Sequence, residues 1–326
     1  MTTVTILFYL LCGTTALMQG VKWMGEGLEG ANTEKIKRTL KIFTGNTLSS
    51  MISGTVITAL VQSSTAIMVM TVGLVNARLM TLSQAIGIIY GTNIGTTVTV
   101  QLMSFHLSDM AFPAIIIGMV LASFCQSSSM KHIGLSILGF GFLFTGLSLL
   151  NASVPYIRES EFFYNMFTTL GNNPMLALWV GLFTTMLVQS SSATVGLTIV
   201  LFNAGLIDIE CAVLLTMGDN IGTCATAQIA SIGTSTAAKR VAWAHTLYNI
   251  IGVIIVLIFL GPFIRLVEYV TAILGQDKTR LIANTHTLFN ILSAVLFYPI
   301  TKYYIAFIEW LVRDKKSLQK IFSFVL

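Results

Sequence analysis

The sequence predicts an all-α, polytopic membrane protein built from two inverted repeats, and three observations support this class. First, 55% of the 326 residues are hydrophobic and 10% are charged, whereas soluble domains contain roughly 25% charged residues. Second, several charge-free apolar stretches reach the length of about 20 residues that a transmembrane helix needs. Third, residues 58–99 align with residues 185–226 without a gap, at an offset of 127, with 19 identities in 42 positions.

Two short polar phrases are the most similar parts of the repeat. The first phrase is Gln62-Ser63-Ser64-Thr65 in one copy and Gln189-Ser190-Ser191-Ser192 in the other. An apolar arm of about 15 residues lies on each side of the phrase, and such an arm spans only about 22 Å at 1.5 Å per residue. This is shorter than the bilayer core. We therefore expect two re-entrant helical hairpins, at about 43–77 and 174–207, with the polar phrase at each tip.

The second phrase follows each hairpin and interrupts an apolar stretch, at about 81–108 and 209–236. It reads Gly91-Thr92-Asn93-Ile94-Gly95-Thr96 and Gly218-Asp219-Asn220-Ile221-Gly222-Thr223. Two glycines around an Asn predict a discontinuous helix whose unwound carbonyl groups can coordinate a ligand.

The remaining apolar stretches predict the linking spans and the domain limits. We expect repeat 1 at 1–150, repeat 2 at 151–301 and a basic cytoplasmic tail at 302–326. The predicted linking spans are 4–24, 111–128, 133–150, 241–261 and 281–300, and 270–280 is expected to be a loop or an interfacial segment.

The basic residues predict the orientation in the membrane. With an external N-terminus and hairpins that return to their own side, 14 of the 18 Lys and Arg residues lie inside, as the positive-inside rule requires. Three crossings separate the hairpins, so the second unit is inverted. These features predict a multi-pass protein of the inner (plasma) membrane with a cytoplasmic C-terminus. The lipid bilayer is then a partner and nucleic acid is not, while a homodimer stays open.

The hairpin tips are the predicted anion site. The second arm of each hairpin begins at Ser64 or Ser191, so free N–H groups and the positive end of the helix dipole can hold an anion. Bonding between helices is the alternative role for these Ser and Thr side chains. The candidate substrate-binding residues are Gln62, Ser63, Ser64, Thr65, Gln189, Ser190, Ser191, Ser192, Asn93 and Asn220.

Asp219 occupies the position that Thr92 has in the other repeat. A lone carboxylate inside a membrane is costly and is usually paired with a cation or protonated. Na⁺ is a natural partner, while a distant structural pair or a permanently protonated acid are the alternatives. The candidate Na⁺ ligands are Asp219, Asn220, Thr223, Asn93, Thr96, Ser64 and Ser191. No organic cofactor is expected.

Two further polar patterns are interpreted as structural. Gln126-Ser127-Ser128-Ser129 resembles a third tip but lacks the second phrase, so we expect the polar end of a span. His245 and Asn249, like His286 and Asn290, lie on one helix face at i and i+4, which favours hydrogen bonds between helices over metal binding. Since no Ser–His–Asp or metal-ligand constellation converges in the repeats, the chain is not expected to be an enzyme.

These paired motifs, in this order, resemble the type II sodium-dependent phosphate cotransporter family over about residues 46–299. The resemblance implies Na⁺-driven import of inorganic phosphate, with Gln62–Thr65 and Gln189–Ser192 forming the sites and Asn93, Thr96, Asn220 and Thr223 lining the unwound helices. Many bacterial relatives also carry a soluble regulatory domain, and we expect none here. The residues by themselves support cation-coupled transport of a small anion or polar solute. Transport of sulfate or a dicarboxylate, a phosphate sensor that does not transport, and an anion channel are the alternatives.

Overall fold

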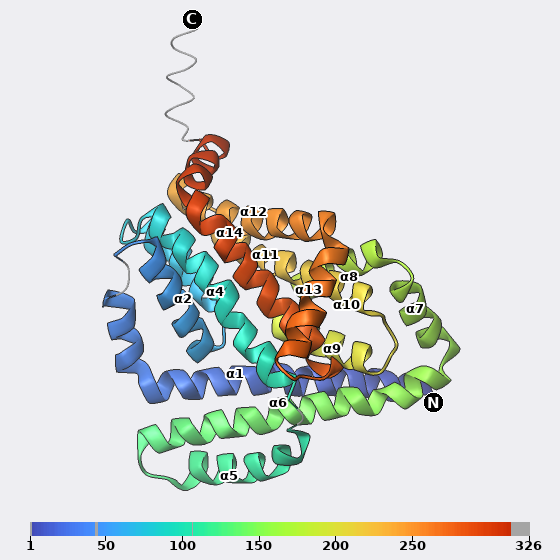
Figure 1. Ribbon diagram of the computed structural model, residues 1–326. Helices are drawn as coiled ribbons and strands as arrows, with labels where there is room; N and C mark the ends of the chain where they lie inside the picture. Colours follow the sequence, from blue (N-terminus) through green and yellow to red (C-terminus); the bar gives the residue numbers. More distant parts are fainter. Residues whose placement is uncertain (1, 43–44, 106, 314–326) are drawn as a thin grey trace, which may run out of the picture.

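The computed structural model describes residues 2–42, 45–105 and 107–313, and every regular element in these ranges is a helix (Figure 1). The chain is therefore an all-α protein. Its helices are α1 (Thr2–Ile42), α2 (Thr47–Val61), α3 (Ser64–Asn76), α4 (Leu82–Met103), α5 (Ala111–Phe124), α6 (Ser128–Glu159), α7 (Glu161–Gly171), α8 (Pro174–Val188), α9 (Ser191–Asn203), α10 (Ile209–Gly222), α11 (Cys224–Ala230), α12 (Thr236–Ile258), α13 (Leu260–Ile273) and α14 (Leu281–Leu311), with 3₁₀ turns at Ser108–Met110 and Lys278–Arg280.

Several of these helices are long and apolar enough to cross a membrane. Within the described ranges they are the segments Thr2–Ala31, Ser128–Glu159, Thr236–Ile258 and Lys278–Leu311. Helices α4 and α5 together form a further candidate, bent by 87° at their junction. The protein is thus a polytopic membrane protein, as its composition predicts.

Both Gln-Ser-Ser phrases break a helix at the predicted tip. Gln62 and Gln189 each end the first helix in the left-handed conformation, with φ of 57°. The next serine then caps the second helix, because Ala66 N donates to Ser63 Oγ at 3.2 Å and Ala193 N to Ser190 Oγ at 3.3 Å. The two arms contain 15 and 13 residues in both units, too short to span a bilayer alone.

The predicted unwinding at the second phrase is wrong in the first repeat. Helix α4 runs without a break through Gly91 and Gly95. In the second repeat, α10 ends at Gly222 and α11 begins at Cys224, but Thr223 between them keeps helical torsion angles of −62° and −22°. The glycines serve close packing instead, since a Cβ at Gly91 would collide with the Met51 carbonyl of α2.

The duplicated sequence folds into duplicated packing. Gly91 lies against the backbone of Met51 and Thr55 on α2, and Gly218 lies against Leu178 and Leu182 on α8. All these pairs differ by the same 127 positions. The α2–α4 and α8–α10 pairs therefore pack in the same way, while the opposite orientation of the repeats in the membrane stays a prediction.

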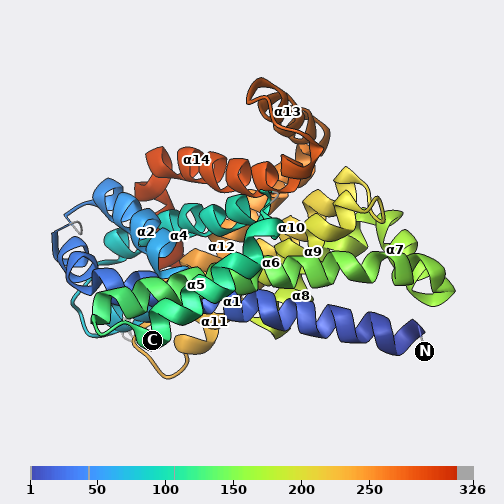
Figure 2. The same cartoon turned by 90° about the horizontal axis from the view of Figure 1, so that it is seen from below.

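Helix α1 is much longer than the predicted span 4–24, because it continues to Ile42. It runs antiparallel to α6 along one side of the molecule, and α5 lies beyond α6 (Figures 1 and 2). Gly13, Gly20 and Gly27, spaced seven residues apart, face α6, where a Cβ would meet Gly146, Gly139 and His132 backbone oxygens. The absence of side chains allows the two backbones to approach closely.

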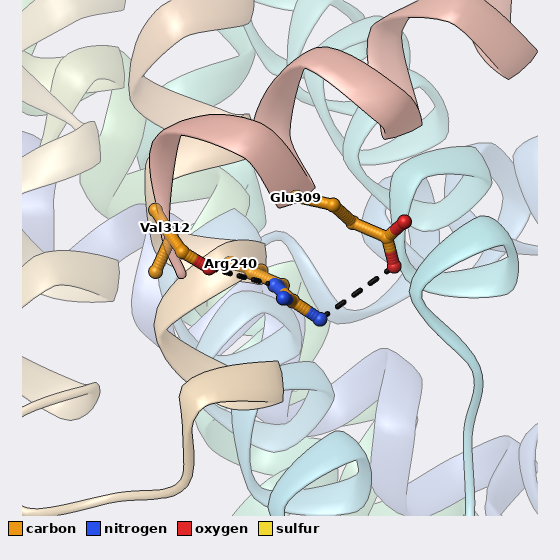
Figure 3. A network of polar contacts seen from close by, with 3 residues as sticks. All are labelled: Arg240, Glu309 and Val312. Atoms are coloured by element: carbon orange, nitrogen blue, oxygen red, sulfur yellow. Dashed lines mark hydrogen bonds and ion pairs between the residues drawn. The ribbon is translucent and has the colours of Figure 1, made fainter. Parts of the chain in front are cut away.

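The C-terminal helix also exceeds its prediction. Helix α14 continues to Leu311, so residues 302–311 of the predicted tail are helical, and residues 314–326 lie outside the described part of the chain. Arg240 at the start of α12 fixes the end of this helix: its Nε donates to Val312 O at 3.0 Å, and its Nη1 lies 3.6 Å from Glu309 Oε1 (Figure 3). The expected loop at 270–280 is helical as far as Ile273.

Candidate functional site

Both hairpin tips line one polar cavity, which we call the central cavity. It has a volume of about 630 Å³. The cavity is therefore many times larger than one water molecule, which takes about 30 Å³ in the liquid. The residues that line it are Thr15, Met18, Gln19, Val21, Lys22, Glu26, Glu29, Val61, Gln62, Ser63, Ser64, Thr65, Ala66, Thr96, Gln189, Ser190, Ser191 and Ser192. Segments 127 positions apart in the chain thus meet at one place.

The structure separates the predicted site residues into two groups. Eight predicted substrate-binding residues, at both tips, line the central cavity together with Thr96. The other predicted residues, Asn93, Asp219, Asn220 and Thr223, lie outside the cavity lining, and Asp219 is 1% exposed. The seven predicted Na⁺ ligands therefore do not share one cluster.

The two tip glutamines are already engaged in hydrogen bonds. Gln62 Nε2 donates to Ala59 O at 2.5 Å, and its Oε1 accepts a hydrogen bond from Thr99 Oγ1 of α4. Gln189 makes the equivalent bonds, to Met186 O at 2.5 Å and from Thr226 Oγ1 of α11. The Gln62 side chain therefore connects its tip to α4, and the Gln189 side chain connects its tip to α11. The sequence did not predict this role.

Asp219 is joined to the second tip by a chain of hydroxyl groups. Thr185 Oγ1 donates to Asp219 Oδ1 at 2.9 Å and lies 2.8 Å from Thr194 Oγ1. The Thr194 hydroxyl also lies 3.0 Å from Ser191 O, directly beneath the tip, and its single proton is given either to that carbonyl or to Thr185 Oγ1. Asp219 Oδ2 has no hydrogen-bond partner among the described residues. A buried carboxylate oxygen in this state is costly without a compensating cation or proton.

The first repeat lacks this arrangement although its backbone packs in the same way. Thr92 replaces Asp219, and its hydroxyl donates to Ile89 O of its own helix at 3.0 Å. Thr58, the counterpart of Thr185, is buried with an unpartnered hydroxyl, as far as the described residues show. Of these two equivalent helix contacts, only the one in the second repeat contains a charged side chain.

The remaining predicted ligands bond within or between helices. Asn93 Nδ2 donates to Asn249 Oδ1 at 3.2 Å, which joins α4 to α12. Asn220 Nδ2 donates to Thr216 O, and Thr223 Oγ1 to Asn220 O, both at 2.8 Å along α10. These side chains carry out structural bonding in this conformation.

The patterns interpreted as structural have mixed outcomes. The third Gln-Ser-Ser phrase lies between α5 and α6, at a helix boundary and outside the cavity lining. The interhelical bond expected of Asn249 is present. His245 has no hydrogen-bond partner at either ring nitrogen within the described ranges, and Asn290 Nδ2 bonds only to His286 O of its own helix, at 2.8 Å.

The sequence analysis missed one side of the cavity, which α1 supplies. Thr15, Gln19, Lys22, Glu26 and Glu29 all line the central cavity. Their spacing of four, three, four and three residues places them on one helix face. This polar stripe, opposite the glycines that face α6, was the available signal, and the predicted end of the first span at residue 24 divided it.

The hairpins α2–α3 and α8–α9 place equivalent tips at one shared cavity within a bundle of apolar helices. This arrangement is typical of membrane transport proteins. The sequence profile described as "Na+/Pi-cotransporter" matches residues 16–152 and 159–276. The chain belongs to this family, which is a family of transporters and not of enzymes.

The chain aligns with several known proteins, and the alignments cover different shares of those proteins. "Uncharacterized protein YqeW" of Bacillus subtilis is 31% identical over 316 residues, which cover 96% of this chain and 98% of that protein. "Putative inorganic phosphate export protein YjbB" of Escherichia coli K12 is 26% identical over 312 residues, 96% of this chain and 57% of that protein. Human "Sodium-dependent phosphate transport protein 2B" is 30% identical over 139 residues, 39% and 20% of the two chains. No solved structure matches the chain.

Proposed function

We propose that the protein is a sodium-coupled secondary active symporter that imports inorganic phosphate and binds it between the two hairpin tips. The observation that carries the proposal is the shared central cavity, which both Gln-Ser-Ser phrases line. Ser63 and Ser190 cap the helices that begin there, so N–H groups and the positive ends of two helix dipoles point toward one anion. Ser64, Thr65, Ser191 and Ser192 add hydroxyl donors.

Sodium is proposed to bind at Asp219. The unpartnered Oδ2 supplies a charged ligand, and the Thr185 and Thr194 hydroxyls, with the Ser191 carbonyl, supply neutral oxygen atoms close by. Binding of Na⁺ would neutralise the buried carboxylate and act on the second tip through this hydroxyl chain. Such a link is what couples a cation to an anion that binds in the neighbouring cavity.

The direction of transport follows from the coupling. A cell that keeps its internal Na⁺ low drives a Na⁺-coupled solute inward. Because the relatives named YjbB are described as phosphate exporters, efflux is the competing direction. Sulfate or a dicarboxylate are the competing substrates, since the tip donors recognise an anion without fixing its shape.

Reconstitution in proteoliposomes tests these points together. We expect uptake of radiolabelled phosphate when Na⁺ is high outside, little uptake with K⁺ in its place, and weak inhibition by excess sulfate or succinate. Phosphate uptake that does not depend on the Na⁺ gradient would refute sodium coupling. Phosphate binding without any transport would instead indicate a sensor.

The opposite orientation of the repeats is part of the proposal, with the C-terminus on the cytoplasmic side of the plasma membrane. Ala77 and Ala204 occupy equivalent positions after α3 and α9. In a variant without the four native cysteines, Ala77→Cys should react with an impermeant thiol reagent only from the inside and Ala204→Cys only from the outside. Reaction from the same side would contradict inversion.

A further inference from the structure

The polar stripe of α1 brings charge to a cavity whose other walls are neutral. Lys22 is the only cation among the described residues that line the central cavity. The tips contribute amide and hydroxyl groups but no formal positive charge. A divalent anion in this cavity therefore meets one full positive charge, which is on α1 beside the carboxylates of Glu26 and Glu29.

Packing fixes this part of α1 beside the first tip. Gly25, between Lys22 and Glu26, lies so close to α2 that a Cβ would collide with Val61 O and approach the Gln62 side chain. Lys22 lies three positions before Gly25, and Glu26 lies one position after it. Their charged groups are therefore held next to the turn that begins at Gln62.

Lys22 already has an anionic neighbour that phosphate can replace. Its Nζ lies 3.8 Å from Glu26 Oε1, and the two side chains are 64% and 49% exposed. An ion pair this exposed is weak, because water and salt screen it. Breaking it costs little, so an anion of higher charge can compete for the ammonium group.

We propose that Lys22 captures phosphate at the central cavity and that Glu26 competes with phosphate for Lys22. This inference rests on the proposed function and assigns two residues to the same site. The pair is closed in the empty cavity and opens as the anion binds. Lys22 supplies one charged hydrogen bond, while the tips supply the geometry of the neutral donors.

Opposite effects of two substitutions test the proposal. Phosphate-dependent uptake is measured in proteoliposomes at fixed saturating Na⁺, together with equilibrium binding of radiolabelled phosphate to the purified protein. Lys22→Gln should raise the phosphate concentration for half-saturation about two- to fivefold at low ionic strength, the range expected for one exposed charge. Glu26→Gln should lower it by about twofold. In the double variant, Glu26→Gln should have no further effect, because its target is gone.

Lys131→Gln is the matched control, since Lys131 is an exposed lysine outside the cavity lining. It should leave half-saturation unchanged. In high concentrations of an inert salt the effect of Lys22→Gln should shrink, because the screening length falls from about 10 Å at 0.1 M to about 3 Å at 1 M. A tighter apparent affinity in Glu26→Gln cannot arise from misfolding.

The outcomes separate the two proposals. If the wild-type protein binds phosphate but Lys22→Gln and Glu26→Gln match it, or both shift affinity in the same direction, the assignment of Lys22 and Glu26 is overturned and the proposed function stands. A wild-type protein that does not bind phosphate in the same assay refutes both.

Discussion

Thr185 donates a hydrogen bond to Asp219 at 2.9 Å, from α8 to α10, at the same helix contact where the other repeat has Thr58 and Thr92. The two contacts have matching glycine packing but different chemistry. One contains a buried carboxylate with an ordered donor, and the other contains two hydroxyl groups that do not bond to each other. The protein thus provides its own internal control for the role of the carboxylate.

Removing the two threonine hydroxyls should therefore have unequal effects. Thr185→Val deletes the donor to Asp219 and should raise the Na⁺ concentration for half-maximal uptake by about tenfold or more, because one hydrogen bond to a charged group contributes about 1.5–3 kcal/mol. Thr58→Val keeps the same shape change and removes an unpartnered hydroxyl, so Na⁺ dependence should not change. Uptake measured against Na⁺ concentration decides this, and equal shifts in both variants would show that shape alone matters.

Asp219→Asn should weaken Na⁺ binding more than any other single change. At an effective dielectric constant of about 20, a carboxylate attracts a cation at 4 Å by roughly 4 kcal/mol before desolvation. Even a third of this energy corresponds to about a tenfold loss of affinity. Half-maximal uptake should need at least that much more Na⁺, while the phosphate dependence at saturating Na⁺ changes less. An unaltered Na⁺ dependence would identify Asp219 as a protonated acid or a structurally paired one.

The three Gln-Ser-Ser phrases should differ in their response to Ser→Ala exchange. Ser64→Ala and Ser191→Ala each remove a hydroxyl at the central cavity, and loss of a bond to a charged ligand costs about 1.5–3 kcal/mol. Phosphate uptake at subsaturating phosphate should fall about tenfold or more. Ser128→Ala, at the start of α6 and outside the cavity, should remain near the wild-type rate. A comparable loss in all three would mean that the wrong copies were assigned to the site.

Close helix packing predicts a difference in stability between two glycines. Gly91→Ala would press a methyl group into the α2 backbone and should destabilise the fold by about 1–3 kcal/mol. At Gly73 of α3 nothing lies within 4 Å of an added Cβ, so Gly73→Ala should be neutral or slightly stabilising. Thermal unfolding in detergent, followed through exposure of the buried Cys211 and Cys224 thiols, compares the two. Equal melting temperatures would contradict the packing argument.

The tips were predictable from sequence because their signal is local and duplicated. A polar Gln-Ser-Ser phrase between two short apolar arms has few alternatives to a helix break, and the break occurs at Gln62 and Gln189 as predicted. The same duplication located half of the residues that line the central cavity. Residues that need a long-range partner were less accessible: nothing in the local sequence connects Asp219 to Thr185 or Thr194.

Glycine produced the main error. In the second phrase, Gly91 and Gly95 are compatible both with an unwound helix and with a helix that packs closely on another. The choice depends on a neighbour, and α2 provides it. Lys22 and Glu26 were not assigned to the site for a related reason. Charged residues near the end of an apolar stretch usually mark the membrane surface, but here they line the central cavity.

The bonds from Gln62 to Thr99 and from Gln189 to Thr226 restrict how such a protein can move. A tip that swings alone as a flexible flap has to break its hydrogen bond, at a cost of about 0.5–1.5 kcal/mol. In the proposed transport cycle we therefore expect each hairpin to move together with its partner helix. The hinges then lie in the segments that connect each hairpin and its partner helix to the rest of the chain. Hinge motions of this kind occur on the microsecond-to-millisecond timescale. A disulfide across such a hinge is expected to stop the proposed transport cycle.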